Sequence, residues 1–314
     1  MNASLIIATR ESRLALWQAH HVKQRLEQQG LGITLLGMTT QGDQILNQPL
    51  SQIGGKGLFI KELEVAMAKG EAHLAVHSMK DVPMELPEGF ELACILERED
   101  PRDAWVSTQY ESLEALPKGA VVGTSSLRRT VLLAAMRPDL RTEPLRGNLD
   151  TRLKKLDSGH YAGIVLASAG LKRLGLSDRI RKTFSLTEMI PAAGQGAIGI
   201  EICSSRRDLL GALTPLNDVK TALEVYAERG VSRTMGGSCS MPLAAHALWG
   251  ENTLHLSASW GDPLLNGSEL IKAEAKRIFD LSAPDLLSQA SQFGAEVANR
   301  LIEKGAVPIV KSGG

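Results

Sequence analysis

Aromatic residues and net charge are both scarce in this sequence. Phenylalanine, tryptophan and tyrosine together make up 4% of the 314 residues, and 35 lysines and arginines are balanced by 35 aspartates and glutamates. Proteins whose main partner is a nucleic acid usually offer stacking aromatic rings or an excess of positive charge. We therefore expect no nucleic-acid partner, and any positively charged site must be local.

Cysteines are few, and the sequence has no long apolar run at its start. The three cysteines, Cys94, Cys203 and Cys239, lie far apart and share no metal-ligand spacing with the seven histidines. This argues against a disulfide framework and against a zinc site. The first ten residues hold only a short apolar run before an arginine, unlike a signal peptide or a membrane span. We expect a cytoplasmic protein without a metal.

What remains is the composition of a globular chain, with 43% hydrophobic and 22% charged residues and a length that allows two or three domains. Apolar spacing predicts two successive sets of alternating strands and helices, which favours α/β units with parallel sheets and right-handed crossovers. Beyond residue 216 the pattern predicts a helix, three strands in succession and a final helix. That order is typical of a small α+β domain with an antiparallel sheet.

The expected element boundaries follow from periodicity, caps and glycine stops. We expect strands at residues 5–9, 33–38, 74–77, 91–96, 120–122, 141–145, 163–167, 197–202, 242–249, 253–260 and 269–278. We expect helices at residues 11–28, 60–67, 126–136, 149–156, 219–226 and 284–304. Asn217 is the expected N-cap of the helix that begins at residue 219. The charged run 97–103 contains a proline and is interpreted as a crossing between domains.

Ionisable groups gather immediately after the strand that ends at His77. Pro83 lacks an N–H group and disfavours a helical conformation at the residue before it, so Lys80 and Asp81 lie on a loop at the strand's carboxyl end. In open α/β sheets ligands bind at that end of the strands. Asp81 is therefore a candidate acid, base or charge-stabilising group. The alternative is an ordinary carboxylate in a turn or a salt bridge.

Two glycine-rich segments look like nucleotide-binding motifs without meeting their requirements. Residues 54–57 contain a Gly-Lys pair, but an ATP-binding loop needs a glycine where Leu50 stands and a serine or threonine after the lysine. Residues 194–199 match G-x-G-x-x-G, yet Pro191 precedes them and the residues that follow alternate like a strand, whereas a dinucleotide site opens a helix. We expect neither ATP nor NAD, and interpret 194–199 as a hinge back to the first domain. The polar segment 39–56 is interpreted as a mobile loop.

An anion site is predicted where residues 123–129 leave a strand and begin a helix, because a helix N-terminus offers free backbone N–H groups. The segment adds three hydroxyl and two guanidinium groups, those of Thr124, Ser125, Ser126, Arg128 and Arg129. More basic groups follow other expected strands: Arg10, Arg146, Arg152, Lys172 and Arg173. Repeated cations at strand ends imply a ligand rich in carboxylates or phosphates. The alternative is a solvated helix that happens to carry arginines.

Cys239 stands in a glycine-containing turn, 236–242, just before an expected strand. A thiol there would be displayed, although a buried structural cysteine is the commoner case. No paired histidine lies nearby in sequence to make it a protease-type nucleophile. The residues alone leave both interpretations open.

In their order, these segments resemble the hydroxymethylbilane synthase family, whose members are also called porphobilinogen deaminases. The resemblance runs nearly end to end. It is carried by residues 8–10, 14–18, 54–59, 76–83, 97–103, 123–129, 145–148, 151–153, 169–171, 194–197 and the turn around Cys239.

The resemblance implies a cytoplasmic, monomeric enzyme of three domains. Two are α/β lobes like those of periplasmic binding proteins, and the third is a small C-terminal α+β domain with a three-stranded antiparallel sheet. The first lobe is expected to comprise residues 1–98 and 197–216, with the catalytic aspartate and the lid loop. The second, rich in arginine and binding carboxylates, is expected at 103–192, and the third, with the cofactor-attachment cysteine, at 217–314.

The resemblance further implies a transferase of haem biosynthesis whose dipyrromethane cofactor is joined to Cys239 by a thioether. Four porphobilinogen molecules are condensed head to tail onto this primer, each with loss of ammonia, and hydrolysis releases hydroxymethylbilane. Loss of ammonia leaves a cationic azafulvene. An ionised Asp81 in a water-poor cleft would stabilise that charge and later accept the proton that the pyrrole ring loses. The implied partners are porphobilinogen and the growing oligopyrrole chain, without nucleic acid or membrane.

Each porphobilinogen carries an acetate and a propionate, which explains why the implied site is rich in cations. The residues expected to hold the cofactor are Cys239, Lys80, Asp81, Thr124, Ser125, Ser126, Arg128, Arg129 and Arg146. Those expected to bind the substrate are Arg10, Ser12, Arg146, Arg152, Arg173 and Gln195. The sequence departs from the family's usual residues at Gly236, Ser238 and Met241, in the turn that holds the thiol.

Two other functions compete with this one. A non-catalytic two-lobed binding protein would clamp a small polycarboxylate, but the displayed Cys239 and the lack of an export signal speak against it. A nucleic-acid binder would use the arginine-rich lobe, and its binding should collapse as salt is added.

Overall fold

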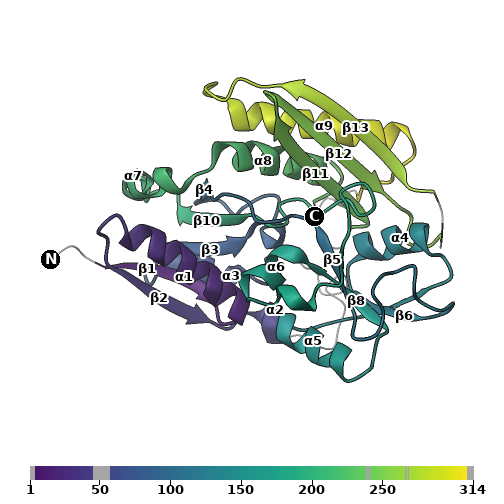
Figure 1. Cartoon of the computed structure of the whole chain (residues 1–314). Coiled ribbons are helices and arrows are strands. Elements are labelled where there is room, and N and C mark those ends of the chain that lie inside the picture. Colours follow the sequence, from purple (N-terminus) through teal and green to yellow (C-terminus); the bar gives the residue numbers. More distant parts are fainter. Residues whose placement is uncertain (1–3, 45–56, 238–240, 266, 268, 310–314) are drawn as a thin grey trace.

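The computed structural model describes residues 4–44, 57–237, 241–265, 267 and 269–309. These residues form three sheets of five, five and three strands (Figure 1). Two sheets belong to α/β lobes, and the third lies above them in the view together with the long helices α8 (Val219–Thr234) and α9 (Leu286–Glu303). The expected fold class is confirmed. No helix of the described part is long and apolar enough to cross a bilayer.

The first lobe has the strand order β2-β1-β3-β10-β4. Its strands are β1 (Leu5–Arg10), β2 (Ile33–Met38), β3 (Leu74–Ser78), β4 (Phe90–Ile95) and β10 (Ile198–Cys203). Its helices are α1 (Arg13–Glu27), α2 (Gln41–Gln44), α3 (Lys61–Ala68) and α7 (Leu210–Leu213), with 3-10 turns at Met79–Asp81, Arg207–Leu209 and Thr214–Leu216. Strands β1, β2 and β3 run parallel, and β10 pairs antiparallel with β3 and β4.

Helices α1 and α3 cover opposite faces of the first sheet. Successive strand residues point to opposite faces, so Ile7 belongs to the core under α1 and Ala8 to the core under α3. Val22 and Leu26 of α1 and Leu63 of α3 are fully buried in these cores. Each such aliphatic side chain contributes about 1.5–3 kcal/mol by leaving water, which fixes β1 and β3 and the loops at their ends.

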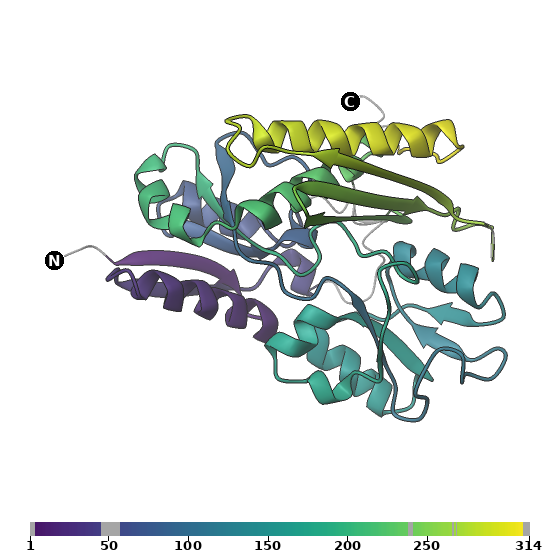
Figure 2. The same ribbon diagram turned by 45° about the horizontal axis from the view of Figure 1, so that its top comes forward.

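The second lobe has the strand order β7-β6-β8-β5-β9, the same plan as the first. Its strands are β5 (Asp103–Val106), β6 (Val121–Gly123), β7 (Arg141–Glu143), β8 (Gly163–Ala167) and β9 (Lys182–Thr183). Its helices are α4 (Leu127–Met136), α5 (Leu149–Asp157) and α6 (Ser168–Arg173), with a 3-10 turn at Ser177–Arg179. Figure 2 shows α6 lying against the end of α1 in the first lobe.

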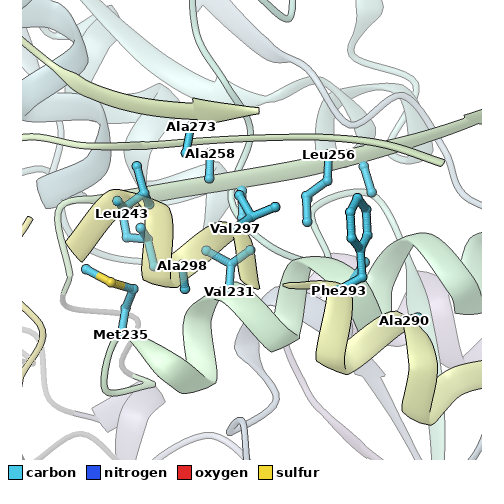
Figure 3. Packing of buried hydrophobic residues seen from close by; sticks show 14 of the residues in the cluster. Val231, Met235, Leu243, Leu256, Ala258, Ala273, Ala290, Phe293, Val297 and Ala298 are labelled. Carbon is cyan, nitrogen blue, oxygen red and sulfur yellow. The ribbon is translucent and has the colours of Figure 1, made fainter. Parts of the chain in front are cut away.

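The third unit pairs the antiparallel strands β11 (Leu243–Gly250), β12 (Thr253–Trp260) and β13 (Ile271–Ile278) with α8 and α9. Figure 3 shows side chains of both helices, including Val231, Phe293 and Val297, packed beneath the sheet. The two helices approach at glycine: a Cβ added to Gly294 would lie 2.0 Å from the carbonyl oxygen of Ala227. This close packing makes α8 a rigid element, and its other side faces the first lobe.

Helix α8 also binds both segments that cross between the lobes. The guanidinium of Arg98, on the outward crossing, donates to both carboxylate oxygens of Glu228 (2.7 and 2.9 Å) and to the carbonyl of Gln195 on the returning crossing (2.9 Å). Glu228 also accepts from the N–H of Gly194 (2.7 Å) and is fully buried. Burial would raise the pKa of Glu228, but the adjacent Arg98 outweighs it and lowers that pKa to about 2. The hinge region is therefore anchored to the third unit by a buried ion pair.

Two expectations about the sheets are wrong. Both large sheets are mixed and not parallel, because the outward crossing enters the second sheet as antiparallel β5 and the returning crossing enters the first as antiparallel β10. Strand β5, which the sequence did not reveal, begins at Asp103, the last residue of the run 97–103, and that residue is charged yet completely buried. An alternating pattern of strands and helices does not reveal a strand that a crossing segment adds to the sheet of the lobe it enters.

Smaller corrections concern individual residues. The N-cap of α8 is Asp218, whose side chain accepts from the N–H of Thr221 (2.7 Å), while Asn217 accepts from the N–H of Ile95 in β4 (3.0 Å). Cys94 in β4 is buried, whereas Cys203 at the end of β10 is only partly buried. Most of the predicted loop 39–56 lies outside the described residues.

Candidate functional site

The Asp81 turn (Met79–Asp81) is a single 3-10 turn that follows β3 directly. Met79 is fully buried, and its N–H donates to the carbonyl of Ala197 on the returning crossing (3.0 Å). Lys80 and Asp81 are half-buried. The predicted catalytic carboxylate therefore lies at the end of a fixed strand, on a short turn with an anchored first residue.

A small pocket opens beside this turn. Its lining comes from β1, α1, β3 and the residues before α3: Arg10, Ser12, Leu14, Ala15, Gln18, Phe59, Ile60, Val76, His77, Ser78 and Asp81. The amide of Gln18 donates to the hydroxyl of Ser78 (2.8 Å), and the hydroxyl of Ser12 caps α1 by accepting from the N–H of Ala15 (3.4 Å). The lining combines polar side chains with apolar ones, as expected of a small-molecule site.

Arg10, at the end of β1, has a carboxylate partner that sequence reasoning missed. Its guanidinium forms an ion pair with Asp43, with Nε donating to Oδ2 at 3.0 Å, and lies 4.3 Å from the centre of the Phe59 ring. Thr40 donates its hydroxyl to the same carboxylate (2.7 Å). Burial would raise the pKa of Asp43, but the hydrogen bonds from Arg10 and Thr40 lower it. The Asp43 carboxylate thus occupies the position beside Arg10 that was predicted for a carboxylate of the substrate.

Basic groups of the second lobe lie within electrostatic range of the Asp81 turn. Burial lowers the pKa of Lys80 to about 8; Asp81 opposes this change, and Arg129 and Arg152 reinforce it. Burial also lowers the pKa of Arg152 to about 10, reinforced by Arg129 and Arg146 and opposed by Asp81. The charges of Lys80, Asp81, Arg129 and Arg152 therefore act on one another across the two lobes. Their contact with a ligand stays a prediction.

Arg128 and Arg129, predicted to bind ligand carboxylates, share an internal one. Asp103 of β5 accepts from Nη1 of Arg128 and from Nη2 of Arg129, both at 2.7 Å. The two arginines are 3% and 6% exposed, and Asp103 is 0% exposed. Burial would raise the pKa of Asp103, but the two guanidinium groups hold it well below the usual range. Ligand binding by these arginines remains a prediction, and any such contact would be additional to this triad.

The hydroxyl groups at the start of α4 also have local partners. Ser126 is the N-cap and accepts from the N–H of Arg129 (3.4 Å), and Thr124 accepts from the N–H of Ser126 (3.2 Å). Ser125 donates to the carbonyl of Leu145 (3.0 Å). The segment therefore leaves a strand and begins a helix as expected, and its role as an anion site stays a prediction.

Gln195 and Arg173 hold the returning crossing. The amide of Gln195, 1% exposed, donates to the carbonyl of Pro101 (2.7 Å) and to Asp103 (3.1 Å). Arg173 donates to the carbonyl of Gly196 (2.8 Å) and lies 5.6 Å from the Trp17 ring. Burial lowers the pKa of Arg173 to about 10. Their predicted substrate contacts are not tested by these interactions.

Cys239 lies outside the described residues, but the chain on both sides of it is described. Gly236 and Gly237 have φ of 106° and 64°, and a Cβ added to Gly236 would lie 2.3 Å from the carbonyl oxygen of Ile309. A Cβ on Gly237 would lie 3.3 Å from the side chain of Met84. The departure from the family pattern at Gly236 therefore suits a position where larger residues do not fit, and Gly237 lies beside Met84, in the segment that follows Asp81.

Comparison with known proteins decides the family. Residues 5–210 match the model described as "Porphobilinogen deaminase, dipyromethane cofactor binding domain", and residues 222–303 match "Porphobilinogen deaminase, C-terminal domain". The chain belongs to the porphobilinogen deaminase family. A porphobilinogen deaminase of Albidiferax ferrireducens is 63% identical over 94% of this chain and 92% of its own length. One of Paraburkholderia phymatum is 57% identical over 99% of this chain and 93% of its own.

Solved structures of low identity also align with the chain. A nutrient binding protein from Burkholderia cenocepacia bound to methionine is 14% identical, with a TM-score of 0.44, over 67% of this chain and 90% of its own. A putative methionine-binding lipoprotein from Bacillus subtilis is 12% identical, with a TM-score of 0.43, over 68% of this chain and 89% of its own.

The site residues fit the cofactor that the family match assigns. A dipyrromethane built from two porphobilinogen units carries carboxylates, so it requires cations that are not already neutralised. Among the ion pairs of the described residues, none involves Arg146 or Arg152, and Arg152 uses its Nε–H for the carbonyl of Gly147 (2.8 Å). Such half-buried cations are stabilised when carboxylates bind. The donor set therefore suits a ligand that carries several carboxylates.

Proposed function

We propose that this chain condenses four porphobilinogen molecules head to tail, each with loss of one ammonia, and releases hydroxymethylbilane by hydrolysis. The observation that supports this most is the pocket lined by both Asp81 and Arg10, with Lys80 and the second lobe's Arg152 within electrostatic range of Asp81. The substrate's side groups are anions, whereas its reacting centre becomes a cation. A site with several cations around one acid matches that distribution of charge.

We assign the basic groups to binding and orientation. Arg10, Ser12, Arg146, Arg152, Arg173 and Gln195 would bind the incoming substrate, and Lys80, Thr124, Ser125, Ser126, Arg128, Arg129 and Arg146 would hold the dipyrromethane, with Cys239 as its attachment point. The dipyrromethane supplies the free pyrrole carbon at which the first condensation occurs. Charge-assisted hydrogen bonds of this kind are directional, so they fix the position of each ring as well as its affinity.

We assign acid–base and electrostatic work to Asp81. When the C–N bond of the protonated aminomethyl group of porphobilinogen breaks, the electron pair leaves with nitrogen as neutral ammonia, and the positive charge stays on the remaining substrate fragment. The ionised Asp81 carboxylate stabilises that charge. After the new C–C bond forms, the attacked pyrrole carbon loses a proton, and Asp81 accepts it or passes it on. Half-burial of Asp81 favours this role, because electrostatic interactions weaken in bulk water.

The division into residues 1–98 with 197–216, 103–192, and 217–314, the cytoplasmic location and the monomeric state are part of this proposal. Their support is the family resemblance, and for the division also the three separate sheets. Sedimentation of the purified protein would give the oligomeric state directly.

The test is to mix the purified protein with porphobilinogen and measure ammonia and hydroxymethylbilane, together with the intact mass under denaturing conditions. We expect four molecules of ammonia for each molecule of hydroxymethylbilane. We also expect the wild-type mass to exceed that of the bare polypeptide, and the mass of the Cys239→Ala variant to equal that of its bare polypeptide. A two-lobed binding protein would bind porphobilinogen without releasing ammonia. Cys94→Ala is the matched control, since that thiol is buried in β4 and burial raises its pKa to about 12.

A further inference from the structure

The backbone that follows the Asp81 turn depends on the third unit for its hydrogen bonds. Residues 82 and 83 belong to no strand or helix, and Pro83 has no N–H to offer a neighbour. Within the described chain, no backbone N–H donates to the carbonyl of Val82 or of Pro83. Buried carbonyls need partners, so a side chain must supply the missing donors.

Arg229 of α8 supplies them. Its Nη1 donates to the carbonyl of Val82 (3.0 Å) and its Nη2 to the carbonyl of Pro83 (2.5 Å). Arg229 is 3% exposed, so these bonds are shielded from water. One helical turn later, Arg233 donates to the carbonyl of Met84 (3.0 Å) from a more exposed position. The guanidinium of Arg229 thus binds the main-chain carbonyls of the two residues directly after Asp81.

Apolar contacts and the returning crossing complete this support. Met79 and Val82, on either side of Lys80 and Asp81, are fully buried and share a core cluster with Ala222 and Val225 of α8. A Cβ added to Gly194 would lie 2.8 Å from the Cβ of Met79, so the crossing lies directly against the turn. The backbone of Asp81 is therefore held on one side by β3 and on the other by α8.

We propose that Arg229 is a positioning residue for Asp81, because it ties the backbone directly after the Asp81 turn to helix α8. The helix ends at Thr234, and Gly237 beyond it approaches the side chain of Met84. Helix α8 and the residues after it therefore lie along the segment that follows Asp81. The inference rests on the proposed function, because it gives Asp81 the acid–base role.

The test is a double-mutant cycle with single-turnover ammonia release, using holoenzyme of measured cofactor content. A misplacement of about 1 Å can cost on the order of a hundredfold in rate, so we expect Arg229→Gln to slow release about 10- to 100-fold with KM changed less than about twofold. Arg229→Lys keeps one charged donor and should recover part of the rate. In an Asp81→Asn background, Arg229→Gln should add little, because it acts through Asp81.

The matched control is Arg137→Gln, which also removes an arginine that donates to main-chain carbonyls, those of Leu113, Glu114 and Leu116, but in the second lobe. It should leave the single-turnover rate unchanged. Additive effects of Arg229→Gln and Asp81→Asn, or a rate loss no larger than that of Arg137→Gln, would overturn the inference. If Arg229→Gln does not fold, the same cycle with Arg229→Lys decides. A wild-type protein that releases no ammonia would instead refute the proposed function.

Discussion

Replacing Asp103 by asparagine should destabilise the protein strongly although the two side chains have nearly the same size. Asp103 is 0% exposed and accepts from Arg128, Arg129 and the amide of Gln195. Asparagine would turn one acceptor oxygen into an NH2 group that faces a guanidinium donor, and it would leave two buried positive charges without a counter-charge. Breaking a buried pair in this way costs about 3–5 kcal/mol, because a buried charge is costly to leave uncompensated.

The assay is urea unfolding followed by circular dichroism, with wild type and variants compared at equal cofactor content. Asp157→Asn is the control in the same lobe, since its partner Arg179 lies 2.5 Å away but both side chains are partly exposed. An exposed pair is worth about 0–1 kcal/mol, so the control should stay close to wild type. A loss of less than about 1 kcal/mol in Asp103→Asn would refute the view that Asp103 chiefly neutralises the two arginines.

Two further predictions concern pH and binding. Burial, and to a smaller extent repulsion from Glu201, raises the pKa of Glu64 to about 7. Between pH 4.5 and 7 the folded protein therefore binds more protons than the unfolded chain, so the free energy of unfolding falls as pH rises through that window. Glu64→Gln should therefore gain about 1–3 kcal/mol relative to wild type between pH 5 and pH 8 in urea titrations, whereas the exposed Glu71→Gln should track wild type; parallel curves for Glu64→Gln and wild type would contradict this. Arg146→Leu removes a predicted carboxylate contact worth about 1.5–3 kcal/mol, so kcat/KM for porphobilinogen should fall roughly ten- to a hundredfold in steady-state assays; unchanged kinetics would remove Arg146 from the site.

Much of the fold could be predicted because it depends on local pattern. The strand β3, the turn that follows it and the start of helix α4 were all expected within a residue or two, since apolar alternation and proline act over short distances. The basic residues at strand ends were expected to lie near one another, because parallel strands present their carboxyl ends at one edge of a sheet.

The partners of those residues could not be predicted, because they come from distant parts of the chain. Arg129 pairs with Asp103, 26 residues earlier, and Arg10 pairs with Asp43, 33 residues later. Arg229 reaches carbonyls 147 and 146 residues away. The available hint of a buried counter-charge was Asp103 itself, an acid that stands directly before the apolar residues 104–106. Pairings of this range depend on how the units are assembled, which periodicity does not encode.

The central claim is that Asp81 works by its charge and its position. Asp81→Asn keeps the size of the side chain and removes the charge, and Asp81→Glu keeps the charge and moves it by one methylene. Loss of a preorganised electrostatic partner typically costs on the order of a hundred- to a thousandfold in kcat. The most direct measurement is single-turnover ammonia release by folded Asp81→Asn and Asp81→Glu proteins at equal cofactor loading. We predict a loss of that size for asparagine, a smaller loss for glutamate, and little change in affinity for porphobilinogen; an asparagine variant as fast as wild type, or a glutamate variant slower than asparagine, would contradict the account.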